Sequence, residues 1–395
     1  DRLTISITMK QTYNRRLVFW TACLGMLLFG IGLIMLGSVL PDLRERHSLN
    51  AVEAGTLLSL LPFGIIFGSL LFGPVCDRYG YRALLAVSAL LMFAGFEGLA
   101  FTRTTGILKL SVFLFGLGGG AINGATNAVV ADISTTGKGA ALSILGVFFG
   151  IGALGMPLLL SLLMAKFDFQ VIVAATGVLA LAAAVLFAFV RFPAAKQAEG
   201  ISMKQVGSLF RDVTLLLIAF FLFFQSSFEG LINNWTTTYL MDRVAAPQEV
   251  ALMGLSAFVA GMTVARLLVG SVLRNLPERQ LLYISLGVTF AALLLFSLSR
   301  STVPAVAGLF LLGAGLAAGF PTMLGIVGNR YPDLSGTAFS FVLVIGLVGN
   351  MIVNYLMGIV TENAGIKHLT TFTYAELAIL VVMATAIFGR LKMNK

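Results

Sequence analysis

The segment that decides the fold is Gly73-Pro74-Val75-Cys76-Asp77-Arg78-Tyr79-Gly80-Tyr81-Arg82, a dense run of charge, glycine and proline between two long apolar stretches. Gly73 lets two helices approach closely, and Gly80 permits a backbone conformation that is closed to other residues. Asp77 can face a helix N-terminus, where negative charge is favourable. The segment therefore predicts a tight turn at a membrane surface.

Composition places the rest of the chain in a lipid bilayer. Of its 395 residues, 58% are hydrophobic and 11% are charged, and the mean hydropathy is +0.97. A soluble domain of this length does not show such values. The net charge is +9, but the Lys and Arg residues lie mostly in the gaps between apolar runs, so we expect no nucleic-acid partner.

Apolar runs of about 20 residues, the length of a membrane-crossing helix, recur along the chain. They predict an all-α membrane protein with twelve transmembrane helices in two six-helix halves with pseudo-two-fold symmetry. The expected domains are an N-terminal bundle (10–191), a cytoplasmic linker (192–212) and a C-terminal bundle (213–395). The expected spans are 17–40, 51–72, 81–101, 108–131, 139–164, 170–191, 213–240, 250–273, 280–299, 304–329, 335–361 and 369–391.

The distribution of basic residues predicts cytoplasmic termini and, for a bacterial protein, an inner-membrane location. With that orientation, all but eight of the 26 Lys and Arg residues fall on the cytoplasmic side, as the positive-inside rule requires. The eight on the opposite side are Arg44, Arg46, Arg103, Lys109, Lys166, Arg243, Arg300 and Lys367.

An internal repeat supports the division into two halves. The stretch 112–143 aligns with 309–340 at a constant offset, so that Phe113 falls on Phe310 and Gly116 on Gly313. The fourth and fifth spans are thus repeated as the tenth and eleventh. Two halves of like direction are expected to be related by an axis along the membrane normal.

The segment at 73–82 resembles the G-x-x-x-D-R-x-G-R-R signature of the major facilitator superfamily, with Tyr81 in place of the first of the paired arginines. The resemblance implies a secondary transporter that works by alternating access, and no constellation of residues supports an enzyme. The placement of charge predicts that this segment holds the cytoplasmic side shut in the outward-open state, by bridging to the start of the eleventh helix. The gating residues are then Gly73, Asp77, Arg78, Gly80 and Arg82.

Amide side chains inside the spans predict a substrate site, because polar groups in hydrocarbon usually face the bundle interior or a water-filled path. Pairs at a spacing of four lie on one helix face, and amides both donate and accept hydrogen bonds, as a neutral polyol needs. Trp235 offers a face for stacking on a sugar ring. The alternative is that the amides join helices. The candidates are Asn123, Asn127, Gln225, Asn233, Asn234, Trp235, Asn350 and Asn354.

Two acids within the spans, Glu229 and Glu97, are candidates for the coupling-ion site, for protons or sodium. Glu97 lies within about a turn of the outer end and could instead snorkel. We expect no cation at mid-membrane, since Arg266 lies close to the cytoplasmic end of its span. An anionic substrate would then lack a counter-charge.

The segment 224–240 and the start of the eleventh span at 335–340 resemble the fucose, galactose and glucose symporter branch. Fucose permeases use acids in the first and fourth spans, whereas here the first span has none and the fourth offers Asn123. Proton coupling through Glu229, sodium coupling and uniport therefore all remain open.

The sequence thus predicts a monomeric transporter of a neutral sugar or polyol, with no cofactor and no metal site. The alternative on the same fold is an exporter of hydrophobic drugs, which the phenylalanine-rich spans and the glycines around Pro157 favour. A non-transporting receptor or a lipid scramblase is the rival from another class, and it would show no saturable solute flux in liposomes.

Overall fold

The computed structural model describes residues 13–134, 138–193, 212–271, 273, 276–331 and 335–393. Within them it contains twelve helical segments that are long and apolar enough to cross a membrane, which confirms the predicted fold class. The helices of the first half are α1 (Arg15–Ser38), α2 (Leu40–His47), α3 (Ala51–Phe101), α4 (Thr105–Ile133), α5 (Lys138–Leu163) and α6 (Phe169–Phe189). Those of the second half are α8 (Val213–Arg243), α9 (Gln248–Ser271), α10 (Glu278–Leu298), α11 (Thr302–Leu316), α12 (Gly319–Arg330), α13 (Ser335–Ala364), η2 (Ile366–His368) and α14 (Leu369–Met393).

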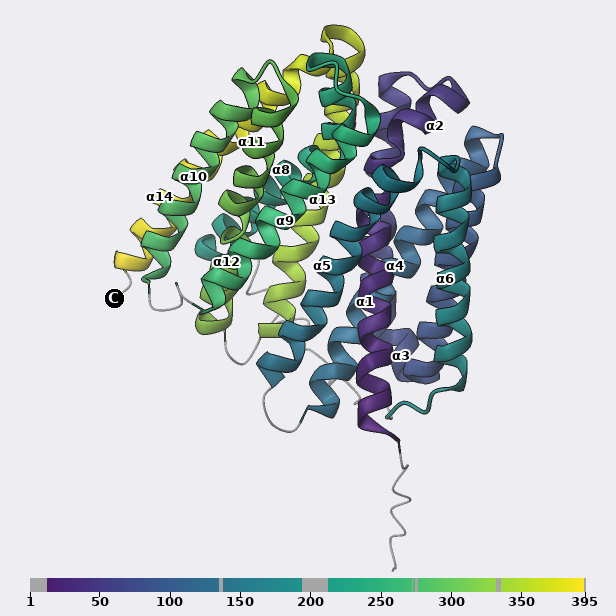
Figure 1. Ribbon diagram of the computed structural model, residues 1–395. Coiled ribbons are helices and arrows are strands. Elements are labelled where there is room, and N and C mark those ends of the chain that lie inside the picture. The colour runs from purple at the N-terminus through teal and green to yellow at the C-terminus, as the bar shows by residue number, and fades with distance from the viewer. Residues whose placement is uncertain are drawn as a thin grey trace, which may run out of the picture.

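The two halves repeat the same helix contacts. In the first half α1 packs against α5 and α3 against α6, and in the second α8 packs against α13 and α10 against α14. Figure 1 shows the two groups side by side, and they meet where α1 contacts α8, α3 contacts α13 and α5 contacts α9. Most of the predicted linker lies outside the described residues, so the domain boundaries stay a prediction.

The second and third spans follow one another within α3, and the turn that the sequence predicts separates them at Gly80. Gly80 has φ +77° and ψ 167° inside α3, a conformation that costs glycine little. Tyr81, at the position where arginine is usual, is buried and donates a hydrogen bond from its hydroxyl to Asp132 Oδ2 of α4, at 3.0 Å. The departure from the signature thus ties the turn to the end of α4.

Small residues allow the halves to touch. A Cβ added at Gly55 of α3 would lie 2.9 Å from both the carbonyl oxygen of Asn354 and the Cα of Gly358 on α13. Close backbone approach of this kind is how membrane helices pack, because lipid provides no hydrophobic drive between them. Any larger side chain at Gly55 must separate α3 from α13.

Hydrogen bonds between the halves, among the described residues, gather at the end of the bundle away from the C-terminus, where α2 lies in Figure 1. Asp42 accepts from Gln248 at 2.6 Å, and the carboxylate of Glu362 accepts from the backbone of Ala51 at 2.7 Å. Thr237 donates to the carbonyl of Gly37 at 2.9 Å. The two halves are thus joined at the end that also carries α2.

Candidate functional site

The polar face of α8 forms the first part of the site. Gln225 is 1% exposed, and its amide nitrogen donates to Glu229 Oε1 at 2.8 Å and to the carbonyl oxygen of Leu316 at 2.9 Å. Glu229 and Asn233 follow on the same face and are half-buried. Gln225 therefore connects a partly exposed carboxylate with the tenth span.

The tenth span is broken at the point that Gln225 reaches. Helix α11 ends at Leu316 and α12 begins at Gly319, two residues before Pro321, so the span is interrupted between them. A proline has no backbone N–H and therefore cannot donate the next hydrogen bond of a helix. The carbonyl of Leu316 is satisfied by Gln225, and that of Gly315 by the hydroxyl of Ser285 on α10.

The far end of α12 is tied to the start of α8. Arg330 contacts Asp212 Oδ2 through Nε and Nη2, each at 3.2 Å, and the hydroxyl of Tyr331 donates to the same oxygen. Burial alone would raise the pKa of Asp212, but Tyr331, the amide of Thr214 and the charge of Arg330 hold it below its usual value. Segment α12 is therefore fixed to α8 at both of its ends.

A second polar cluster joins α8 to α13. Asn354 is fully buried, and its Oδ1 accepts from the side chains of Asn234 and Trp235, each at 3.1 Å. Its Nδ2 donates to the backbone carbonyl of Asn350 at 2.9 Å and to Asn350 Oδ1 at 2.8 Å. Asn350 donates in turn to the carbonyl of Ser226 at 3.1 Å. These contacts position α8 on α13.

Trp235 differs from the arrangement expected of a stacking platform. Its side chain has 0% exposure in this conformation, so no ring face is open to a solute. Asn234, at 5% exposure, and Gln225 are similarly enclosed. Asn350 and Asn233 are half-buried, and Oδ1 of Asn233 is buried without a partner among the described residues. The predicted binding residues thus divide into an enclosed set that holds helices together and an open set that can meet a solute.

Replacing Asn354 with Ala should lower the thermal stability of the purified protein. The side chains of Asn234 and Trp235 would lose their shared acceptor, and an unpaired buried donor costs about 1–3 kcal/mol. The melting temperature in detergent checks this prediction. Asn363→Ala, at an exposed position of the same helix, is the control, and an equal melting temperature for the two variants would contradict the assignment.

Asn123 and Asn127 on α4 are the polar groups that the first half contributes to the candidate site. Asn127 is exposed, and its Nδ2 donates to the carbonyl of Asn123 at 2.8 Å and to Asn123 Oδ1 at 3.1 Å. Asn123 is half-buried. Both of these bonds stay within one helix, so among the described residues the pair joins no helices by its hydrogen bonds, and it leaves acceptor and donor capacity for a solute.

Arg266 supplies a cation near Glu229, and the sequence did not predict this contact. The guanidinium of Arg266 on α9 lies near enough to Glu229 to act on its charge, and the Nε of Arg266 is buried without a hydrogen-bond partner among the residues that the structure describes. The sequence placed Arg266 close to the cytoplasmic end of its span and did not predict that its side chain acts on Glu229. An arginine side chain extends far beyond its backbone position, and its place inside the predicted eighth span was the available signal.

Glu97, the second candidate acid, lies apart from this group. It is half-buried on α3, and a Cβ added at Gly177 of α6 would strike it. Its Oε1 is buried without a partner among the described residues. Of the gating candidates, Arg78 and Arg82 are exposed, and the side chain of Asp77 lies outside the described part of α3, as does the surface of Gly73.

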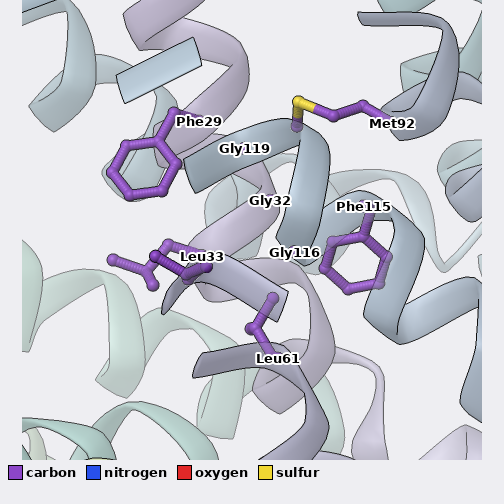
Figure 2. Close-up of a pocket in the computed structure, with 9 residues that line it drawn as sticks. Phe29, Gly32, Leu33, Leu61, Met92, Phe115, Gly116 and Gly119 are labelled. Atoms are coloured by element: carbon purple, nitrogen blue, oxygen red, sulfur yellow. The ribbon is translucent and has the colours of Figure 1, made fainter. Parts of the chain in front are cut away.

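The N-terminal half contains a small apolar pocket between α1, α3 and α4 (Figure 2). The space between its side chains does not admit a water molecule, whereas small-molecule sites usually span about 300–1,000 Å³. Its walls carry no polar side chain. The lining residues are Phe29, Gly32, Leu33, Leu61, Ile65, Met92, Phe115, Gly116 and Gly119.

Asp42 is a titratable group outside the spans, and it accepts the hydrogen bond from Gln248 that connects the two halves. Burial, with a smaller contribution from the charge of Glu45, raises the pKa of Asp42 to about 6, and the hydrogen bond from Gln248 opposes this rise. Separation of the halves would hydrate Asp42 and return its pKa toward its usual value, so protons bind more tightly to the joined state.

Lowering the pH from neutral through about 6 should therefore favour the joined end. Pulsed electron paramagnetic resonance between spin labels at the exposed positions Ser48 and Asn363 measures the separation. We expect the longer-distance population to shrink as the pH falls, and Asp42→Asn to remove most of this dependence. A pH response that is unchanged in Asp42→Asn would contradict the role of this carboxyl group.

Twelve apolar helices in two repeated halves, with polar groups on α4, α8 and α13, define a multi-pass integral membrane protein of the kind that moves small solutes. The sequence model of the Major Facilitator Superfamily matches residues 22–354 and 247–392. The chain belongs to this family.

Named relatives and solved structures agree with this assignment. The glucose/mannose transporter GlcP of Bacillus subtilis (strain 168) is 22% identical over 375 residues, which covers 90% of each chain. The structure of a D-xylose-proton symporter superposes with a TM-score of 0.80 at 16% identity, over 94% of this chain and 97% of that one. A mutant form of the nucleoside transporter NupG superposes with a TM-score of 0.79 at 17% identity, over 95% and 99%.

Proposed function

We propose that the protein is a secondary transporter, and no enzyme, that moves a neutral sugar or related polyol across the membrane by alternating access. The observation that carries the proposal is the open set of polar groups on three helices: Asn123 and Asn127 on α4, Glu229 and Asn233 on α8, and Asn350 on α13. Sugar hydroxyls donate and accept hydrogen bonds, and amides offer both. The names of the glucose/mannose relative and the D-xylose symporter favour the same substrate class.

The enclosed residues have a supporting role in this proposal. Gln225 fixes the carboxylate of Glu229 and the break at Leu316, and Asn354 fixes Asn350, Asn234 and Trp235. Residues locked by their own hydrogen bonds hold the binding groups in place, which lowers the entropic cost of binding a solute. The site therefore lies between the halves, with its geometry set within the second.

Protons are the coupling ion in this proposal, with sodium as the alternative. Glu229 is the acid on the open face of α8, and Arg266 supplies a counter-charge when Glu229 is ionised. Proton loss or gain at Glu229 changes its hydrogen bond with Gln225, and Gln225 contacts the break between α11 and α12. A change in the protonation of Glu229 thereby affects the break between α11 and α12. In this proposal, movement at that break opens or closes the second half.

Orientation follows from the basic residues. With both termini in the cytoplasm of a bacterial inner membrane, the joined end that carries Asp42 and Gln248 is the outer one. The structure then represents a state closed to the outside. We propose a monomer, since each chain supplies both halves of the site.

The gating segment gives a separate prediction. Replacing Asp77 with Asn should slow transport more than it weakens substrate binding, because Asp77 acts on the closure of the cytoplasmic side and belongs to α3, which carries none of the open polar groups. Turnover and binding affinity are measured on the same preparation. An unchanged turnover would refute the gating role.

Uptake into proteoliposomes tests the function itself. Vesicles are offered a panel of neutral sugars, each with and without an imposed proton or sodium gradient. We expect saturable uptake of at least one sugar and its accumulation only with the proton gradient. Accumulation that follows sodium would replace the coupling ion, and uptake of no member of the panel would reject the substrate class.

Export of hydrophobic compounds finds less support. The apolar pocket of Figure 2 is small and lies within one half. Efflux of lipophilic cations from the same vesicles compares the two functions directly.

A further inference from the structure

Glu376 is a buried carboxyl group that the sites above do not use. It lies on α14 and is 4% exposed, and its Oε1 is in short hydrogen-bond contact with the hydroxyl of Ser227 on α8, which is 0% exposed. Its other oxygen, Oε2, is buried without a partner among the described residues. Glu376 lies within the predicted span 369–391.

The hydrogen bonds around Ser227 require one hydrogen more than its hydroxyl provides. Ser227 Oγ lies 3.0 Å from the carbonyl oxygen of Phe224, which can only accept, and it also contacts Glu376 Oε1. A serine hydroxyl has a single hydrogen. Each contact is a hydrogen bond with a hydrogen of its own, and not a shared one, only if Glu376 carries a proton and donates to Ser227, which then donates to Phe224.

Charge leads to the same protonation state. An isolated ionised carboxylate in an apolar interior is very costly, and such a group usually becomes neutral instead. No charged side chain acts on Glu376, and no ion pair includes it in the described part of the chain. The charged or titratable side chains on the elements packed around α14 are Glu229, Tyr239, Asp242, Arg243, Glu278, Arg279, Tyr283, Lys367, His368, Tyr374, Arg390 and Lys392.

The contact with Ser227 bears on the position of α8. The backbone carbonyl of the neighbouring residue, Ser226, accepts a hydrogen bond from the side-chain amide of Asn350 on α13 at 3.1 Å. Two consecutive residues of α8 therefore form hydrogen bonds with two different helices, α14 and α13. Gln225 and Glu229 lie immediately before and just after them on the same helix, so the placement of the polar face depends on both attachments.

We propose that Glu376 carries a proton in the neutral-pH transporter, keeps it throughout the transport cycle, and thereby fixes α8 against α14. Glu376 is thus a positioning residue and a proton-binding site separate from the one that exchanges the coupled proton. Its ionisation would place a second negative charge inside the half that already holds Glu229, without a cation beside it.

Infrared difference spectroscopy of the whole protein at neutral pH tests the protonation state. Wild type minus Glu376→Gln should show the carbonyl stretch of a protonated carboxylic acid, and Ser227→Ala should shift that band. Glu249→Gln, at an exposed position, should remove no such band. A difference spectrum that shows only ionised carboxylate would overturn the proposal. If Glu376→Gln does not fold, the shift in Ser227→Ala alone decides, since an ionised Glu376 has no such band to shift.

Transport tests whether the proton stays in place, and this part rests on the proposed function. Glu376→Gln imitates the protonated group permanently, so it should accumulate substrate down a proton gradient as wild type does. Lost accumulation with intact substrate counterflow would show that Glu376 releases its proton in each cycle and would overturn the proposal. Failure of wild type to transport any sugar would reject the proposed function while the infrared result stands by itself.

Discussion

Glu229→Gln should abolish proton-driven accumulation of substrate while substrate counterflow continues. Glutamine keeps the shape of the side chain and can still pair with Gln225, which lies 2.8 Å from Glu229 Oε1, but it cannot exchange a proton. Counterflow needs the halves to alternate with substrate bound and needs no net movement of protons. We expect the internal concentration of substrate to rise to the external level and no further.

The same vesicles supply the controls for this variant. Glu249→Gln removes an exposed carboxylate at the start of α9 and should accumulate substrate as wild type does. Glu97→Gln distinguishes the second candidate acid, which lies in the contact with Gly177. Accumulation by Glu229→Gln at the wild-type level would assign coupling elsewhere, and a defect in Glu97→Gln alone would assign it to Glu97.

Gly55→Leu should abolish transport by preventing closure of the end where the halves are joined. The added side chain would meet the backbone of Asn354 and Gly358, whose atoms lie 2.9 Å from the position of a Cβ. Overpacking costs roughly 1–3 kcal/mol, so the joined state should be depleted on the order of 5- to 150-fold. Both accumulation and counterflow require that state.

Spin labels at Ser48 and Asn363 measure this loss of closure. In Gly55→Leu the distance distribution should shift to the separated state, while substrate binding from that side persists. Gly287→Leu is the matched control, because no atom lies within 4 Å of a Cβ at that glycine. Full transport activity in Gly55→Leu would contradict the close approach of α3 and α13 as the closing contact.

Local properties of the sequence predicted most of the fold. The length and apolarity of each span depend only on neighbouring residues, so twelve helices follow from hydropathy. The turn at Gly80 and the break before Pro321 are likewise local consequences of residue type. Helix α2 was not predicted, although the signals for its start are local. These signals are Pro41 in its first turn and Asp42 beside it.

The candidate site could be predicted only in part, because its contacts join distant residues. The spacing of Asn350 and Asn354 showed a shared helix face, but not that Asn354 would be enclosed by Trp235. The contact of Gln225 with Leu316 and that of Ser227 with Glu376 depend on which helices pack together. A side chain's role as binder or as helix contact follows from its tertiary neighbours.

We propose that polar groups on α4, α8 and α13 bind a neutral sugar and that Glu229 couples its movement to protons. The external pH of lightly buffered vesicles, recorded when a neutral sugar is added without any imposed gradient, tests both parts together. We expect a saturable alkalinisation that is absent in Glu229→Gln, because each entering sugar brings a proton with it. Sugar entry into wild-type vesicles without any change in external pH would contradict it.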